Sequence, residues 1–186
     1  TDNGGTAEGV TSAATAAVAN VNDAPTGAVT IDGTVTQNQT LAANVTAVSD
    51  ADGINATTVT YRWLRDDAAI DGATNATYTL AQADVGSAIT VTFGYTDNGG
   101  TAESVTSAAT AAVIDVNDNP TGAVTIDGRN TKADTLTANI QAVGDLDGMI
   151  GATYTYQWLG DGAVITGATN ATYTLAQADV GSAITV

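Results

Sequence analysis

Apolar and polar residues alternate along several short stretches of the chain. Between residues 88 and 96, Ile89, Val91, Phe93 and Tyr95 fall on one face. This period of two is typical of β-strands that bury one face. Gly, Asp and Asn separate the stretches. The pattern predicts strands at residues 26–32, 39–48, 58–65, 68–71, 76–80, 88–96 and 101–114. Their expected buried faces include Leu41, Ala43, Val45 and Ala47, and further along Val59, Tyr61 and Trp63.

One segment has an ambiguous composition. Residues 108–112 read Ala-Ala-Thr-Ala-Ala, which also suits a helix. Val105, Val113 and Ile114 flank this run at strand spacing, and Thr recurs through it. We therefore expect a strand there and no helix.

The whole pattern repeats with an offset of 95 residues. Residues 1–91 and 96–186 share 67 identities in 91 positions without an insertion or deletion. Tandem arrays of this kind favour a spacer or display role over catalysis. Residues 1–22 are predicted to be the C-terminal strand segment of a preceding repeat, 24–118 a complete repeat, and 119–186 a repeat without its last strands. The chain is therefore expected to be a window on a longer array.

Composition excludes several kinds of chemistry. The chain has no Cys and no His, so zinc sites, thiol nucleophiles and imidazole bases are excluded. Twenty acidic residues against four basic ones give a net charge of −16, which argues against nucleic acid and anionic membranes as partners. No apolar run approaches membrane-spanning length, so no direct membrane insertion is expected.

Several stretches resemble a known family. YRWL at 61–64, IDGATNATYTL at 70–80 and ADVG at 83–86 are similar to the bacterial immunoglobulin-like tandem repeats of giant secreted adhesins of the RTX and biofilm type. Trp63 stands where such domains place the core Trp of their third strand. Together with the seven predicted strands, this implies an all-β fold of tandem immunoglobulin-like β-sandwiches, about seven strands each, in an end-to-end array.

The linkers carry a second resemblance. DVNDNP at 115–120 resembles the calcium linker between cadherin repeats, and NVNDAP at 20–25 is a weaker version in which Asn20 replaces Asp115. In an immunoglobulin-like unit, the linker and the loops at 50–53 and 97–100 meet at one end. Calcium takes about 6–8 oxygen ligands, and such a cluster can supply them. The expected ligands of Ca²⁺ are Asn22, Asp23, Asp50, Asp52, Asp97 and Glu103, with Asn117, Asp118, Asp145 and Asp147 at the second junction.

Each acidic motif also has a purely structural interpretation. The DNGG sequence at 97–100 is a strong hairpin turn, and DADG at 50–53 suits an ordinary Asp/Gly turn. Asp66 and Asp161 are interpreted as hairpin-turn residues, and Asp84 as a cap at a corner. Only the convergence of several segments favours calcium over these alternatives.

The first functional hypothesis is a non-catalytic, calcium-rigidified extender of a secreted adhesin on a bacterial surface. Its partners would be neighbouring repeats or identical chains, with the tip ligand outside this segment. The alternative is a subunit of a self-assembling extracellular filament or sheath, completed by strand donation between neighbours. A ligand-binding module of a secreted hydrolase or lectin is a weaker hypothesis, because no aromatic cluster outside the predicted core offers a sugar platform. An enzyme is the least expected, and no catalytic residues are predicted.

Overall fold

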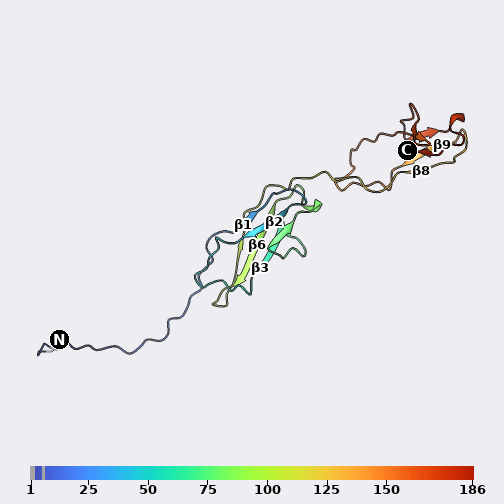
Figure 1. Cartoon of the computed structure of the whole chain (residues 1–186). Helices are drawn as coiled ribbons and strands as arrows, with labels where there is room; N and C mark the ends of the chain where they lie inside the picture. The colour runs from blue at the N-terminus through green and yellow to red at the C-terminus, as the bar shows by residue number, and fades with distance from the viewer. Residues whose placement is uncertain (1–2, 6) are drawn as a thin grey trace. The chain divides into compact units, whose positions relative to one another are not determined.

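The computed structural model describes residues 3–5 and 7–186; residues 1, 2 and 6, which belong to the predicted 1–22 segment, lie outside the described part. The fold is all-β, built from four small antiparallel sheets (Figure 1). The described residues form no α-helix, and hence no apolar helix that could cross a membrane. Two compact units can be distinguished. The first comprises residues 1–35, 39–80 and 86–113, and the second residues 36–38, 81–85 and 114–186.

The first unit contains two sheets. Its strands are β1 (Thr30–Asp32), β2 (Thr40–Asn44), β3 (Thr60–Arg65), β4 (Ala68–Ala69), β5 (Thr77–Thr79), β6 (Ile89–Thr96) and β7 (Ala102–Thr106). One sheet has the order β1-β2-β5 and the other β4-β3-β6-β7. Each of the seven predicted strands has a counterpart at its predicted place in the chain, but β1, β2 and β7 are clearly shorter than predicted.

The core of the first unit lies between these sheets. Leu41 of β2, Trp63 of β3 and Val91 of β6 are fully buried. The rings of Trp63 and Tyr78 lie 5.8 Å apart and connect the two sheets. On β6, Ile89, Val91, Phe93 and Tyr95 are all buried, so the predicted face is confirmed. Burial of this apolar area is the main stabilising contribution.

Local turns fix the position of Trp63. Its indole Nε1–H donates to the carbonyl of Asn75 at 2.9 Å, and its backbone N–H donates to the carbonyl of Ala73 at 3.1 Å. The β3–β4 hairpin turns at Asp66 and Asp67, whose φ values of 44° and 66° are those of a two-residue hairpin turn. The interpretation of Asp66 as a turn residue is confirmed.

Three predicted strands are shorter than expected. The strand predicted at 26–32 begins only at Thr30. The strand predicted at 39–48 ends at Asn44, because the Asn44 side chain accepts hydrogen bonds from the N–H and hydroxyl of Thr46 and starts a turn. Ala47 is consequently exposed, and its predicted place on the buried face is wrong. The strand predicted at 101–114 continues only to Thr106.

Residues 107–113 follow the edge of β6 without forming a regular ladder. The N–H groups of Ser107, Thr110 and Val113 donate to the carbonyls of Val91, Ile89 and Ser87. Each step of three residues along this segment therefore matches a step of two residues along the facing segment at 87–91. The hydroxyls of Ser107 and Thr110 accept the N–H groups of Val91 and Ile89, both at 3.0 Å. The segment is neither helix nor regular strand, since Ser and Thr oxygens replace backbone acceptors.

The second unit repeats part of this architecture. Its strands are β8 (Thr125–Asp127), β9 (Thr135–Asn139), β10 (Leu159–Gly160), β11 (Ala163–Val164), β12 (Thr172–Thr174) and β13 (Ile184–Thr185). They form the sheets β12-β9-β8 and β11-β10-β13. Trp158 is fully buried and packs with Leu136 and Leu175. Short 3₁₀ turns, η1 (Gln82–Asp84) and η2 (Gln177–Asp179), follow β5 and β12.

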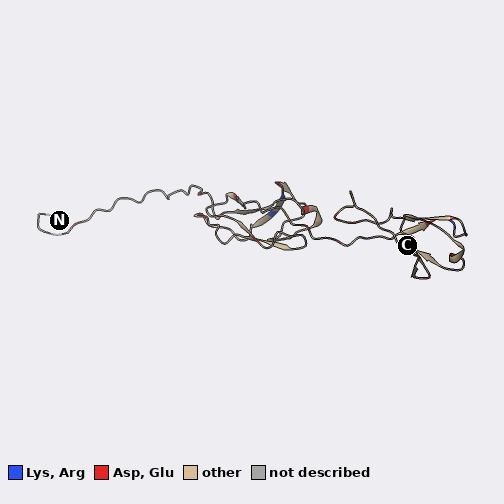
Figure 2. Ribbon diagram, turned by 90° about the horizontal axis from the view of Figure 1, so that it is seen from above, with Lys and Arg blue, Asp and Glu red and all other residues tan. Residues whose placement is uncertain are grey.

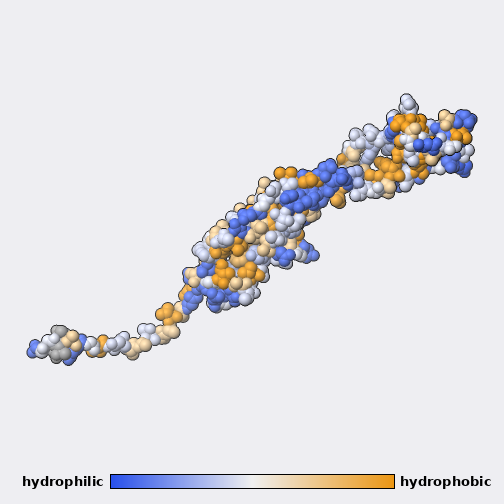
Figure 3. All heavy atoms as spheres, in the orientation of Figure 1, coloured by the Kyte–Doolittle hydropathy of each residue, from blue (hydrophilic) through white to orange (hydrophobic). Residues whose placement is uncertain are grey.

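Both 3₁₀ turns are closed by an aspartate. The Asp84 carboxylate accepts the N–H of Ala81, and Asp179 accepts that of Ala176, both at 2.7 Å. The prediction of a corner cap at Asp84 is confirmed. Apolar residues of the second unit, including Val124, Tyr154 and Val180, are exposed, and Figure 3 shows hydrophobic atoms on its surface.

Candidate metal centre

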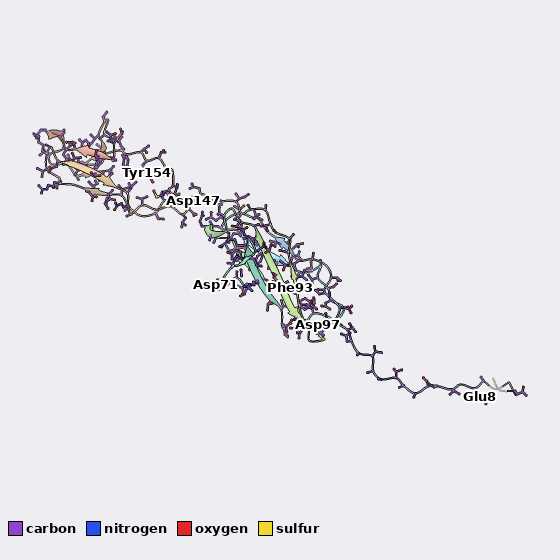
Figure 4. The ribbon with its side chains drawn as sticks, turned by 180° about the vertical axis from the view of Figure 1, so that it is seen from behind. Glu8, Asp71, Phe93, Asp97, Asp147 and Tyr154 are labelled. Carbon is purple, nitrogen blue, oxygen red and sulfur yellow. The ribbon has the colours of Figure 1, made fainter. Side chains whose placement is uncertain are left out.

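Two loops and the first linker meet at one end of the first unit. The N–H of Asn98 donates to the carbonyl of Gly53 at 3.1 Å, and Ile54 and Asp97 form an isolated bridge. Their approach is so close that a Cβ at Gly53 would collide with the side-chain amide of Asn98. Figure 4 places Asp97 at the end of the unit from which the N-terminal segment leads away. The predicted meeting of these segments is confirmed.

The linker is held by the carboxylate of Asp52. The N–H of Asp23 donates to Oδ2 of Asp52 at 2.8 Å, and the amide of Asn20 donates to Oδ1 at 2.7 Å. These two hydrogen bonds lower the pKa of Asp52, since they favour its charged form. A third contact joins the linker to β7, because the amide of Asn22 donates to the Glu103 carboxylate at 2.8 Å.

Both carboxylate oxygens of Asp50 accept hydrogen bonds. Its Oδ1 accepts the N–H of Asp52 at 2.8 Å, as in an Asp-initiated turn. Its Oδ2 accepts the phenol of Tyr95 at 2.6 Å. Burial of Tyr95, this hydrogen bond and the charges of Asp50, Glu103 and Asp97 together raise the pKa of the phenol well above its ordinary value.

Asp97 differs from the other loop acids in its burial. Only 2% of the residue is exposed, and its Oδ1 accepts the N–H of Thr101 at 2.7 Å. Among the described residues, its Oδ2 is one of three buried polar side-chain atoms without a hydrogen-bond partner. An unpaired buried carboxylate oxygen is costly, because its lost hydration is not replaced. The hairpin-turn role of Asp97 therefore accounts for one of its oxygens and leaves the other unexplained.

The second junction repeats two contacts of the first. The N–H of Asp118 donates to Oδ2 of Asp147 at 2.7 Å, and the N–H of Asp147 donates to Oδ1 of Asp145 at 3.0 Å. The amide of Asn117 donates to the carbonyl of Asp118. Asp115 stands where the first junction has Asn20, and a carboxylate cannot donate to Asp147.

As placed, these acids do not form a ready-made metal centre. Within residues 3–5 and 7–186, no group of three or more acidic side chains is arranged to hold an ion. The six predicted ligands of the first junction lie on segments that contact one another, but Asp52, Glu103 and Asp50 bind N–H and O–H donors. The calcium site stays a prediction.

Sequence reasoning missed three residues of these junctions. Tyr95 and Asn20 hydrogen-bond to loop acids, and both ends of the Gln37 amide contact the second linker: Nε2 donates to Asp118 at 2.9 Å and Oε1 accepts the N–H of Val116 at 3.0 Å. Tyr95 lies two residues before Asp97, so the same strand face could have indicated it. Nothing in the sequence around Gln37 indicates its role.

The sequence was compared with models of protein families and with curated proteins. The sequence matches no model of a known protein family, and no curated protein matches it.

Proposed function

We propose that the chain is a non-catalytic extender segment of a secreted bacterial surface adhesin, made of immunoglobulin-like β-sandwich repeats whose junctions are stiffened by calcium. The observation that carries the proposal is the buried Oδ2 of Asp97, which has no partner among the described residues although it lies in the loop that meets the linker. A bound cation would supply that partner.

The chemistry of the donors fits calcium. Carboxylates of Asp50, Asp52, Asp97 and Glu103 and the amide oxygen of Asn22 are hard oxygen ligands, and neither loop contains a basic residue. Figure 2 shows acidic residues on both units and few basic ones. When bound, calcium would neutralise carboxylates that repel one another. The chain's own residues already align the linker through the hydrogen bonds of Asp23 and Asn22.

The linker also restricts motion by itself. Pro25 fixes one backbone angle, and the hydrogen bond from Asp23 to Asp52 recurs between Asp118 and Asp147. A cation bridging linker and loops would remove the remaining freedom. At the second junction, replacement of Asn20 by Asp115 removes a hydrogen-bond donor and adds a negative charge. We therefore expect the second junction to depend on the cation more than the first.

Calorimetric titration with CaCl₂ tests the proposal. We expect binding with a Kd of about 10⁻⁴–10⁻³ M, typical of extracellular modules. Asp97→Asn should weaken binding, whereas Asp71→Asn, an exposed acid in another loop, is the matched control. EDTA should lower the melting temperature and make the chain more compact and flexible in small-angle scattering. The absence of binding heat, together with identical melting and scattering in calcium and in EDTA, would reject the calcium-stiffened extender.

A further inference from the structure

The hairpin turn between β6 and β7 contains an Asn-Gly pair, Asn98 and Gly99, in the loop that meets the first linker. The N–H of Asp97 donates to the carbonyl of Thr101 at 2.8 Å, which closes the hairpin. The N–H of Gly100 donates to the carbonyl of Asp97 at 3.3 Å, which is longer than the usual range of about 2.7–3.2 Å. The backbone of the pair is therefore held only weakly inside a well-closed hairpin.

The side-chain amide of Asn98 differs from the other amides in this unit. Asn44 and Asn55 each use the amide oxygen to accept the N–H and the hydroxyl of the threonine two residues later. Asn98 is exposed, and within the described part of the chain its amide makes no hydrogen bond. The backbone N–H of Gly99 has no acceptor among the described residues either. A free side-chain amide therefore lies next to a free backbone N–H.

Gly99 leaves its backbone nitrogen unshielded. It has no side chain to cover the N–H, and glycine rotates about its backbone bonds more freely than any other residue. The weak turn hydrogen bond of Gly100 does little to prevent this rotation. The nitrogen of Gly99 can therefore reach the amide carbon, Cγ, of Asn98.

We propose that Asn98 is a site of spontaneous deamidation. The Gly99 nitrogen bonds to Cγ of Asn98, the Cγ–Nδ2 bond breaks, and ammonia leaves with the proton that the Gly99 nitrogen gives up through water. Water then opens the resulting succinimide ring at either carbonyl. The products are aspartate with the original backbone and isoaspartate, whose backbone runs through the side chain. The reaction consumes only water, so it needs no enzyme, metal or oxidant.

The reaction places a new carboxylate at the candidate metal centre. The amide of Asn98 lies against Gly53, the residue that follows Asp52. Asp97, whose Oδ2 has no partner among the described residues, precedes Asn98 in the chain. Calcium affinity depends on the number of charged ligands. This second part of the inference rests on the proposed function: the aspartate form of the loop binds calcium more tightly than the asparagine form.

Peptide mass spectrometry of the 186-residue chain, kept folded at mildly alkaline pH, tests the modification. Glu8 and Glu103 are the only two glutamates, so cleavage after Glu separates Asn98 from the second Asn-Gly pair at residues 3–4. Residue 98 should gain the mass difference between an amide and an acid, partly as isoaspartate. Asn75, which is exposed, lies in the same fragment and is followed by Ala, should keep its amide. No gain at residue 98, or an equal gain at Asn75, would overturn the proposal.

Two variants test the ring closure. Gly99→Ala adds a Cβ beside the attacking nitrogen, and the nearest atom to that Cβ would be Oδ1 of Asp97 at 3.3 Å. Gly99 does not have a positive φ, so Ala should fit after a slight shift of the Asp97 side chain. Asn98→Gln keeps the amide but moves it one carbon further from the nitrogen. Both variants should retain their ammonia over the period in which the unmodified chain loses it. Loss at the unmodified rate in either variant would overturn the mechanism.

Calorimetric titration with CaCl₂ tests the consequence for the metal centre. Asn98→Asp reproduces the aspartate product and should bind calcium about fivefold more tightly than the freshly purified chain, because it adds a charged ligand. Asn75→Asp adds the same charge at an exposed site outside both loops and should not. Equal affinities of the three proteins would overturn the calcium part alone. An absence of binding in all three would reject the proposed function, whereas the masses would still decide whether Asn98 is deamidated.

Discussion

The two repeats share most of their sequence but differ in how much of their sheet is paired. Trp63 and Trp158 are both fully buried, and each donates its indole N–H to an Asn carbonyl 12 residues later at 2.9 Å. The tryptophan environment is therefore a local property, formed by the turn that follows and reproduced in both units.

The strands that carry these tryptophans are not reproduced. β3 spans Thr60–Arg65, whereas its counterpart β10 spans only Leu159–Gly160. In β3, Thr60 pairs with Gly94 and Tyr61 with Phe93. Residues 1–186 contain no second-repeat counterparts of Gly94 and Phe93. Thr155 and Tyr156, identical to Thr60 and Tyr61, are not in a strand. The difference teaches that a strand of this chain is defined by its partner more than by its own propensity.

The cores differ for the same reason. Val29 is 2% exposed in the first unit, and its counterpart Val124 is 45% exposed in the second. A cavity of about 270 Å³ lies beside Val124, Tyr156 and Val186. In the first unit, Phe93 and Tyr95 contribute to the corresponding part of the core. We expect the second unit to be the less stable of the two.

Truncation of the equivalent leucine in each core should give the largest difference in stability between the two units. Leu41 and Leu136 are both buried, so Leu41→Ala and Leu136→Ala should each cost about 2–5 kcal/mol. The smaller core of the second unit should not tolerate this loss, so Leu136→Ala should unfold it in water. Leu41→Ala should leave the first unit folded at lower stability. Urea titration, followed by the fluorescence of the one tryptophan in each unit, measures both; Val164→Ala, at an exposed site, is the control. Equal losses with both units still folded would contradict the comparison.

Residues 12–18 and 107–113 have the identical sequence SAATAAV and offer a second, smaller test. Thr110→Val removes the hydroxyl that accepts the N–H of Ile89 and leaves that group unsatisfied, at a cost of about 1–3 kcal/mol. Thr15→Val makes the same change in the exposed copy and should leave the unfolding free energy unchanged. Urea titration of both variants checks this. A similar loss in both would show that residues 12–18 are already docked within their own chain.

The strand positions could be predicted because period-two alternation and Gly, Asp or Asn turns report directly on local geometry. The buried face of β6 and the turn at Asp66 are examples. The helix alternative for residues 108–112 was rejected correctly, but their three-to-two pairing could not be foreseen. This pairing depends on the hydroxyls of Ser107 and Thr110, which accept N–H groups in place of backbone carbonyls. The hydrophobic periodicity of the sequence contains no sign of these side-chain hydrogen bonds.

The candidate metal centre could be predicted only as a meeting of loops. Chain direction and strand count bring the loops at 50–53 and 97–100 to the linker, and the structure confirms this. Which oxygen stays unpaired depends on side-chain partners such as Asn20 and Tyr95. Those partners lie on different segments, so sequence spacing contains no information about them.

A backbone position with positive φ should cause a smaller difference in stability between the repeats. Ala133 has φ of 72°, and its counterpart Asn38 has 65°. Asn adopts this left-handed conformation more readily than Ala. Ala133→Asn should therefore stabilise the second repeat by about 0.5–1 kcal/mol, and Asn38→Ala should be destabilising by a similar amount. Urea midpoints of the two variants measure the effect. Because Ala133 is exposed, no packing change obscures it. Opposite signs from those expected would refute the role of strain.

The smallest expected difference between the repeats is in how the stability of each unit depends on alkaline pH. Burial, the hydrogen bond to Asp50 and the nearby acids raise the pKa of Tyr95 in the folded state above the value near 10 of an unfolded chain. A raised folded pKa means that the protonated phenol stabilises the fold below about pH 10 and that this contribution is lost as pH rises above it. The urea midpoint of the first unit should thus stay level up to about pH 10 and fall as the pH rises further towards the raised pKa of Tyr95. Tyr95→Phe should flatten that dependence.

The second unit contributes its own slope through Tyr173, whose pKa is raised chiefly by its hydrogen bond to Asp179. Tyr173→Phe in the same experiment isolates that slope, and the dependence that survives in Tyr173→Phe but disappears in Tyr95→Phe belongs to the loop end of the first unit. If Tyr95→Phe keeps the full dependence, the phenol does not hold Asp50 in solution as it does in the structure.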